Sequence, residues 1–431
     1  MSKKRPFFST AVLSILGRSG GFLIPFVIAA VYGANPSTDA FFFAYAIVLS
    51  LINIFSHIFE SALVPYLVER KASPERVSAF ANGILWLALP AALLMAGAIG
   101  LVLFLFTQGR NPEFSSLIVS LLFEMIPSFL LSILVAESHS LFLAYKRFWF
   151  PAFSPFFRSL AMILSWLGFH SSLGIHALTL GFLAGEILRF LIAIFLLKRL
   201  PRRPWKIPPA DFQEIFAFYR QAGFQVLALA AINLMFLVDQ GFALPFGEGK
   251  ISLINYADRL LQAPYLLFFN GIVQVFLPFW SEGYQENVPL FWARVKKDVR
   301  VVFWAALGFT VLLWIFRYGI IQVTFFLGKF SRLERLELTA VFGWLALGFL
   351  PGVLSVLYAR VLFILRKSRL YCLQIWAGFA VKIFLNSIFS RRFGLEGIAL
   401  STFLVYSLSA LWLHFYIQRM SRAAVPSKDF R

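Results

Sequence analysis

Long apolar stretches recur along the whole chain, and short polar or basic segments separate each stretch from the next. Most stretches hold about 20 residues or more, the length at which an α-helix crosses the hydrocarbon core of a bilayer. The pattern predicts an all-α membrane protein with about twelve transmembrane helices. The expected spans are 9–32, 40–64, 79–106, 115–143, 150–169, 174–197, 218–245, 252–279, 301–325, 338–364, 370–389 and 395–418.

Lysine and arginine concentrate in every second connecting segment when the N-terminus is taken as cytoplasmic. Short cytoplasmic loops carry this excess of basic residues in membrane proteins, so the alternation supports both the number of spans and their orientation. Arg18 interrupts the apolar run that follows Lys3-Lys4-Arg5, which favours an uncleaved first helix over a signal peptide. We therefore expect both termini in the cytoplasm.

A segment rich in proline and arginine follows the sixth span and divides the chain into two halves. We expect an N-terminal lobe at 1–198, a basic cytoplasmic linker at 199–211, a C-terminal lobe at 212–418 and a cytoplasmic tail at 419–431. Duplicated halves are common in secondary transporters. A second inside segment, 281–300, mixes aromatic and aliphatic residues with lysine and arginine. Its pattern fits an amphipathic helix on an anionic leaflet and equally a solvated connector.

Composition agrees with a membrane protein, since 60% of the residues are hydrophobic and only 14% are charged. Soluble domains are about one quarter charged. The net charge of +19 would suit a nucleic-acid-binding protein, but the basic residues follow the loops and thus indicate orientation. Cys372 is the single cysteine, so the chain has no internal disulfide. No GxxxxGK[ST] motif, metal-ligand spacing or catalytic arrangement is recognisable, and we expect a non-enzyme without cofactor or metal.

Two arginines lie deep inside expected spans, Arg18 in the first half and Arg259 in the second. A cation at that depth costs a few kcal/mol unless it faces protein or trapped water. Asp239 in the preceding span is a candidate counter-ion for Arg259, and a buried ion pair is as good an explanation as a functional site. If both arginines line a central cavity between the lobes, the cavity would attract an anion such as phosphate or pyrophosphate.

Other charged residues lie within the spans or at their ends. Asp39 begins the second span in a Ser-Thr-Asp helix start, which places an anion at the membrane rim. Glu186 and Arg189 are three residues apart and predict a local ion pair. Arg317 and Lys382 lie near span ends, where long side chains reach the interface cheaply. The residues assigned to the supporting network are Glu60, Arg158, Asp239, Asp258 and Arg360.

Several motifs occur in the order in which one transporter family carries them, from residue 9 to about residue 370. They are GRSGGF at 17–22, YGA at 32–34, STDAFF at 37–42, FESALVP at 59–65, RFWFPAFSP at 147–155, YADRL at 256–260 and YARVLF at 358–363. In these motifs the chain resembles the MurJ/MviN lipid II flippases of the multidrug/oligosaccharidyl-lipid/polysaccharide exporter superfamily. Only STDAFF and YADRL are specific by themselves.

The resemblance implies a two-lobed helix bundle in the bacterial inner membrane that opens alternately to either side. It would carry an undecaprenyl-pyrophosphate-linked glycan, with lipid II as the expected substrate, from the inner to the outer leaflet. On matching positions Arg18 and Arg259 would hold the pyrophosphate, and Asp39 would belong to the outer gate or its polar network. We assign all three residues to the substrate-binding site. The family's transport is thought to depend on membrane potential or a bound ion, and no residue pattern here identifies an ion site.

The chain departs from the family pattern at two expected cavity cations. Ile24-Pro25 stands where the family carries an Arg-Asp pair, and the apolar run around Ile52 lacks an arginine. Arg158 or Arg360 would have to substitute. The departures keep open a transport-inactive scaffold or regulatory homologue, or an exporter of another lipid-linked oligosaccharide. A membrane glycosyltransferase would need a larger outer loop with carboxylates, and a drug/ion antiporter would favour acidic cavity residues.

Overall fold

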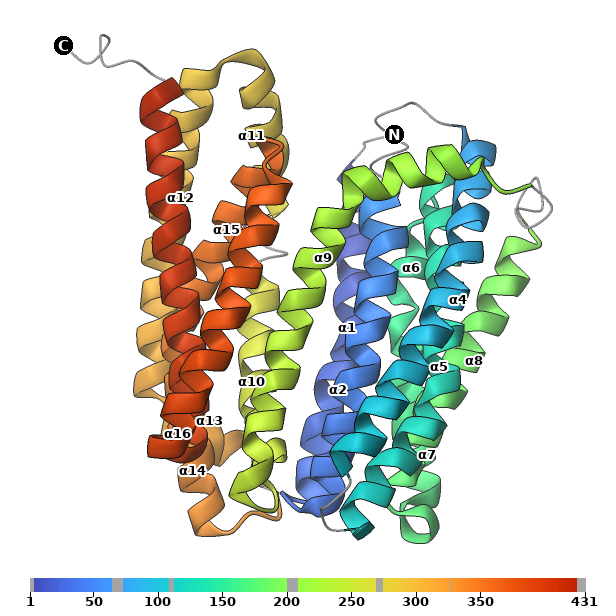
Figure 1. The fold of residues 1–431 in the computed structure, drawn as a ribbon, viewed down its shortest axis with the longest axis vertical. Coiled ribbons are helices and arrows are strands. Elements are labelled where there is room, and N and C mark those ends of the chain that lie inside the picture. The colour runs from blue at the N-terminus through green and yellow to red at the C-terminus, as the bar shows by residue number, and fades with distance from the viewer. Residues whose placement is uncertain are drawn as a thin grey trace. The chain divides into compact units, whose positions relative to one another are not determined.

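The computed structural model describes residues 4–63, 73–107, 112–199, 208–268, 274–326 and 328–424. Throughout these ranges the regular elements are helices (Figure 1). The chain divides into two compact units. The N-terminal unit comprises Met1–Ile28 and Pro36–Ala230, and the C-terminal unit comprises Ala29–Asn35 and Ala231–Arg431. The short turn between the first two helices therefore belongs with the second half of the chain.

In the N-terminal unit, helix α5 packs against α2, α4 and α8, and α7 packs against α8. The helices of this unit are α1 (Lys4–Val31), α2 (Pro36–Ser56), the π-helical turn η1 (His57–Leu63), α4 (Pro74–Thr107), α5 (Pro112–Ala144), α6 (Trp149–Phe153), α7 (Pro155–Leu173) and α8 (His176–Leu197). Pro155 starts α7 at its first position, where the missing N–H breaks no helical hydrogen bond. Helix α9 (Phe212–Ala243) begins in this unit and ends in the other.

In the C-terminal unit, α15 packs against α12 and α16, and α14 packs against α10 and α16. Its helices are the 3₁₀ turn η3 (Leu244–Phe246), α10 (Lys250–Leu267), α11 (Gln274–Glu286), α12 (Val288–Ile315), α13 (Arg317–Thr324), α14 (Arg332–Leu347), α15 (Phe349–Ile364) and α16 (Ser368–Ala424). A capping box starts α14, since Ser331 and Glu334 each bond to the other's backbone N–H.

Helix α16 is two antiparallel arms joined by a sharp turn at Gly394, whose φ of 58° lies in the left-handed region that glycine adopts without strain. Side chains of the first arm bond to the second arm. The Gln374 Nε2 donates to Ser409 Oγ at 2.7 Å, and Lys382 Nζ donates to the carbonyl oxygen of Ile398 at 3.2 Å. The two arms correspond to the last two spans expected from the sequence.

The all-helical fold is confirmed, and nine candidate spans in the described residues are long and apolar enough to cross a membrane. Some boundaries differ from the expected ones. The expected span 301–325 begins earlier, at Val288, and breaks at Phe316 into α12 and α13. The expected span 338–364 is two helices that meet at Gly348. The segment 281–300 forms the end of α11 and the start of α12, where Phe291 is fully buried. Residues 200–207 of the expected linker and 425–431 of the tail lie outside the described residues.

Candidate functional site

Arg259 lies on α10, and its guanidinium binds an amide instead of a carboxylate. Its Nη1 donates to Gln262 Oε1 at 2.7 Å, and Gln262 Nε2 donates to Asp258 Oδ2 at 2.7 Å. Gln262 thus bridges two adjacent charged residues that point about 100° apart around the helix. Arg259 is partly exposed, and its buried Nε makes no hydrogen bond to any described residue. The guanidinium keeps donors for an anion.

Helix α10 is held in place by two tyrosines on either side of Arg259. The Tyr256 hydroxyl donates to the carbonyl oxygen of Gly33 at 2.7 Å, and its ring packs against Phe325 and Phe330. The Tyr265 hydroxyl donates to the carbonyl oxygen of Gly348 at 3.3 Å. The YADRL motif therefore carries a structural anchor, Tyr256, less than one helical turn before the charged Arg259.

Asp239 of α9 pairs with Lys382 of α16, so the expectation that it neutralises Arg259 is wrong. Lys382 Nζ lies 2.9 Å from Asp239 Oδ1, and the two side chains are 2% and 10% exposed. Asn386 Nδ2 also donates to Asp239 Oδ1 at 2.8 Å. Lys382 Nζ further bonds to Ser401 Oγ at 3.1 Å and to Thr402 Oγ1. One ammonium group thus joins α9 to both arms of α16.

The burial of Lys382 also corrects the expectation that it reaches the membrane interface. With 2% of its side chain exposed, it stays inside the unit and makes an ion pair there. Arg317 differs, since its Nη1 donates to the carbonyl oxygen of Trp314 at 2.6 Å and its guanidinium stacks on the same tryptophan ring. The sequence position of the two residues near span ends gave no sign of this difference.

A second polar network joins α5, α7 and α8 in the N-terminal unit around the fully buried Glu186, and it includes Ser154 between α6 and α7. Its Oε1 accepts from Arg189 Nη1 at 2.6 Å, which confirms the expected local pair, and from Arg158 Nη1 at 3.2 Å. Arg189 Nε donates to Ser154 Oγ at 2.9 Å, and His139 Nε2 lies 3.1 Å from the same hydroxyl. Arg158 is thus committed to an ion pair.

Arg18, Asp39 and Glu60 belong to the N-terminal unit. Arg18 lies on α1, and its side chain, like that of Glu60 in η1, lies outside the described residues. The backbone of α1 packs closely against Ala152 at Gly17, the residue before Arg18. A Cβ added to Gly17 would lie only 2.3 Å from the carbonyl oxygen of Ala152. Asp39 lies in the first turn of α2 and is 3% exposed. The helix N-terminus stabilises its negative charge.

The remaining positions singled out in the sequence are Arg360, Ile24 and Ile52. Arg360 is exposed on α15 and makes no ion pair with any described residue. Ile24 and Ile52, which stand at positions where the resemblance leads one to expect arginines, are buried at 3% and 6% exposure. In the described ranges, no group of three or more histidine, cysteine, aspartate or glutamate side chains is arranged to hold a metal ion.

Sequence reasoning missed Gln262 as a partner of Arg259. Its spacing was the available signal, because i+3 from Arg259 and i+4 from Asp258 place its amide on the same helix surface as both charges. It also missed Asn386, Ser401 and Thr402. Nothing in the sequence pairs these with Asp239, since the contact depends on which helices are neighbours.

Known proteins similar to this chain agree in family and in fold. The family model described as "Lipid II flippase MurJ" matches residues 28–428. The chain belongs to this family. The lipid II flippase MurJ of Burkholderia cenocepacia is 25% identical over 465 aligned residues, covering 99% of this chain and 89% of the relative. The probable lipid II flippase MurJ of Buchnera aphidicola subsp. Acyrthosiphon pisum is 25% identical and covers 84% of this chain and 72% of the relative.

Solved structures show the same fold. A lipid II flippase MurJ in an inward closed conformation superposes with a TM-score of 0.80 at 22% identity, covering 95% of this chain and 87% of that chain. An inward-facing multidrug-resistance MATE transporter of the MOP superfamily superposes with a TM-score of 0.77 at 12% identity, covering 97% and 96%. This MurJ-family chain is therefore a multi-pass membrane protein with a transporter fold.

Proposed function

We propose that this protein is a flippase that moves a polyprenyl-pyrophosphate-linked glycan, lipid II, from the inner to the outer leaflet of the bacterial inner membrane. Membership of the MurJ family supports this function. The observation in the molecule that carries it is Arg259, a deep guanidinium that binds a neutral amide and keeps an unpartnered Nε among the described residues.

The chemistry of the substrate fits such a group. A pyrophosphate is a compact anion, and a guanidinium binds phosphate oxygens through two parallel, charge-assisted hydrogen bonds. A carboxylate on Arg259 would compete with the substrate, whereas Gln262 fixes the side chain without neutralising it. We assign Arg259 and Arg18 to the pyrophosphate, and Asp39 to the polar groups of the outer gate. Asp258 belongs to the network that positions Arg259.

The experiment is rescue of a bacterial strain in which the resident lipid II flippase is depleted. The unchanged protein should restore growth, and Arg259→Ala and Arg18→Ala should each abolish rescue at normal membrane expression. Arg259→Lys keeps the charge but loses the two-pronged hydrogen bonding, so it should rescue partially. Arg392→Ala is the matched control, because Arg392 is an exposed arginine in the C-terminal unit and should be dispensable.

Full rescue by both alanine variants would refute the assignment of these arginines. Failure of the unchanged protein to rescue, together with unchanged outer-leaflet labelling of lipid II when it is expressed, would favour the transport-inactive homologue. The buried isoleucines at 24 and 52 keep that second candidate open, because each leaves the chain one cation short of the family pattern. Labelling of a different lipid-linked oligosaccharide would redirect the proposal to that substrate.

The proposed orientation, with both termini cytoplasmic, can be tested with one cysteine at a time. Cys372 is the only cysteine, so Cys372→Ser gives a background without thiols. In that background Arg392→Cys should react with a membrane-impermeant maleimide in intact cells, and Lys297→Cys should react only after the membrane is opened. The reverse labelling would refute the orientation.

A further inference from the structure

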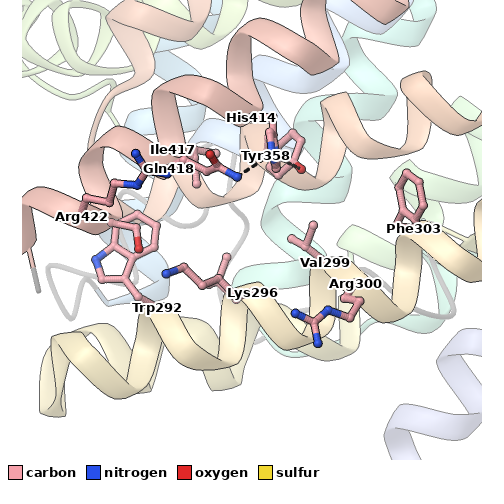
Figure 2. A pocket seen from close by; sticks show the side chains of 12 residues that line it. Trp292, Lys296, Val299, Arg300, Phe303, Tyr358, His414, Ile417, Gln418 and Arg422 are labelled. Atoms are coloured by element: carbon pink, nitrogen blue, oxygen red, sulfur yellow. Dashed lines mark hydrogen bonds between the residues drawn. The ribbon is translucent and has the colours of Figure 1, made fainter. Parts of the chain in front are cut away.

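A pocket of about 400 Å³ lies within the C-terminal unit between α12, α15 and the second arm of α16 (Figure 2). It shares no residue with the network around Arg259. Apolar side chains form much of its wall, among them Val295, Val299, Phe303 and Ile417. In Figure 2, Trp292, Lys296 and Arg422 lie towards one end of the pocket and Phe303 towards the other, with Arg300 between Lys296 and Phe303. We call the end with Lys296 and Arg422 the polar end.

Three basic residues line this pocket, and no acidic residue does. Lys296 and Arg300 are one helical turn apart on α12, and Arg422 lines the pocket from α16. None of the three makes an ion pair with any part of the chain that the structure describes. All three side chains are exposed, so they reach the pocket without being buried themselves. The charge of the pocket therefore suits an anion.

Hydrogen bonds along one wall orient a hydroxyl donor. Gln418 Nε2 lies 2.7 Å from His414 Nε2, and His414 Nδ1 lies 2.7 Å from the Tyr358 hydroxyl oxygen. When the Gln418 amide donates to Nε2, the neutral imidazole carries its own proton on Nδ1 and donates it to the tyrosine oxygen. The Tyr358 hydroxyl proton is then left to donate to another acceptor.

Two more polar groups in the lining lack a partner. Trp292 Nε1 and Ser421 Oγ are buried and make no hydrogen bond to any described residue, and their residues are only 3% and 2% exposed. An indole N–H can only donate, so it needs an acceptor. Buried polar groups are nearly always hydrogen-bonded, so both groups can bond to a ligand that enters the pocket. A phosphate offers several acceptor oxygens at once.

We propose that this pocket binds the phosphate headgroup of an anionic phospholipid. The phosphate is held by Lys296, Arg300 and Arg422 and accepts from the Tyr358 hydroxyl. The upper part of an acyl chain lies along Val299 and Phe303. A lipid suits the pocket better than a free phosphate because its wall is apolar over most of its length. The polar end also lies where α12 begins and α16 ends, at the face that the sequence predicts to be cytoplasmic and therefore next to anionic lipids.

The test uses the purified full-length protein in detergent, titrated with phosphatidylglycerol and with phosphatidylcholine, with bound lipid counted by native mass spectrometry. The pocket variant K296Q/R300Q/R422Q should lose phosphatidylglycerol affinity by about tenfold or more. The control variant K297Q/R369Q/R419Q removes the same charge at exposed positions outside the pocket and should bind as the unchanged protein does. Tyr358→Phe keeps the ring and should weaken phosphatidylglycerol binding about threefold, the effect of one hydrogen bond.

Equal losses in the pocket and control variants would overturn the proposal, because they would indicate attraction by net charge alone. Unchanged binding in both the triple pocket variant and Tyr358→Phe would also overturn it. Displacement of the bound lipid by millimolar inorganic phosphate, with no preference between the two lipids, would assign the pocket to free phosphate. Thermal unfolding of each variant in the same detergent separates loss of binding from loss of fold. The rescue assay stays independent, since none of these residues is assigned to the transported substrate.

Discussion

Replacing Lys382 with methionine removes the cation that Asp239 pairs with and leaves a carboxylate inside the helix bundle. Both side chains are buried, at 2% and 10% exposure, so solvent cannot take over the role of the lost partner. Breaking a buried pair by removing one member costs about 3–5 kcal/mol. We expect Lys382→Met to lower the free energy of unfolding by that amount.

The distance in the pair supports this magnitude. At 2.9 Å, and with an effective dielectric constant of 20, the attraction between two unit charges is about 6 kcal/mol before desolvation is subtracted. The ammonium also donates to Ile398, Ser401 and Thr402, and methionine can replace none of these hydrogen bonds. The loss of stability in Lys382→Met should therefore exceed the loss that follows from breaking an exposed ion pair such as Arg76–Glu214.

The assay is a double-mutant cycle, with the free energy of unfolding measured in mixed detergent micelles. Asp239→Asn alone leaves the ammonium unpaired, whereas Asp239→Asn with Lys382→Met leaves no unpaired charge. The double variant should therefore be more stable than the sum of the single losses predicts, by about 2–4 kcal/mol. The control cycle is Arg76 with Glu214, whose side chains are 56% and 45% exposed and whose coupling should stay below about 1 kcal/mol.

A coupling between Asp239 and Lys382 below about 1 kcal/mol would refute the reasoning. It would mean that water or another group compensates the charge when the partner is removed. Retention of stability in Lys382→Met alone would lead to the same conclusion.

Three further changes have definite expected outcomes. Gln262→Glu places a carboxylate on Arg259 and should abolish rescue as fully as removing the arginine, with expression unchanged; normal growth would contradict this. Gly17→Ala should destabilise the protein by about 1–3 kcal/mol, since the new Cβ meets a backbone oxygen at 2.3 Å, while Gly168→Ala, with open space around it, should be neutral or stabilising in thermal unfolding. Glu186→Gln removes the carboxylate shared by two arginines and should cost about 3 kcal/mol in the same measurement; a loss under 1 kcal/mol would contradict it.

The helical architecture could be predicted because span length and loop charge are local properties of the chain. The break at Gly348 was missed because the residues on both sides of it are apolar, so the pattern shows one continuous span. The turn at Gly394 appeared as the gap between two expected spans. In each case the prediction depended on whether polarity changes along the chain.

Partners of buried charges were harder to predict than helices. Glu186 and Arg189 were paired correctly because three residues along a helix fix their proximity. Asp239 was paired with the wrong cation, since its true partner lies on a helix far away in sequence. Lys382 and Arg317 both lie near the ends of expected spans, and this position does not distinguish them. Lys382 is buried, whereas Arg317 stacks on a tryptophan.

The residues that turn the chain from its first helix into its second are grouped with the C-terminal unit, where the Tyr256 hydroxyl holds Gly33. The backbone therefore passes from one unit to the other three times, after Ile28, after Asn35 and after Ala230. Two of these junctions are inside continuous helices, α1 and α9. A transporter that rocks one half against the other would have to flex its helices at these junctions, so stiffening either of them should slow the cycle without touching any residue that meets the cargo.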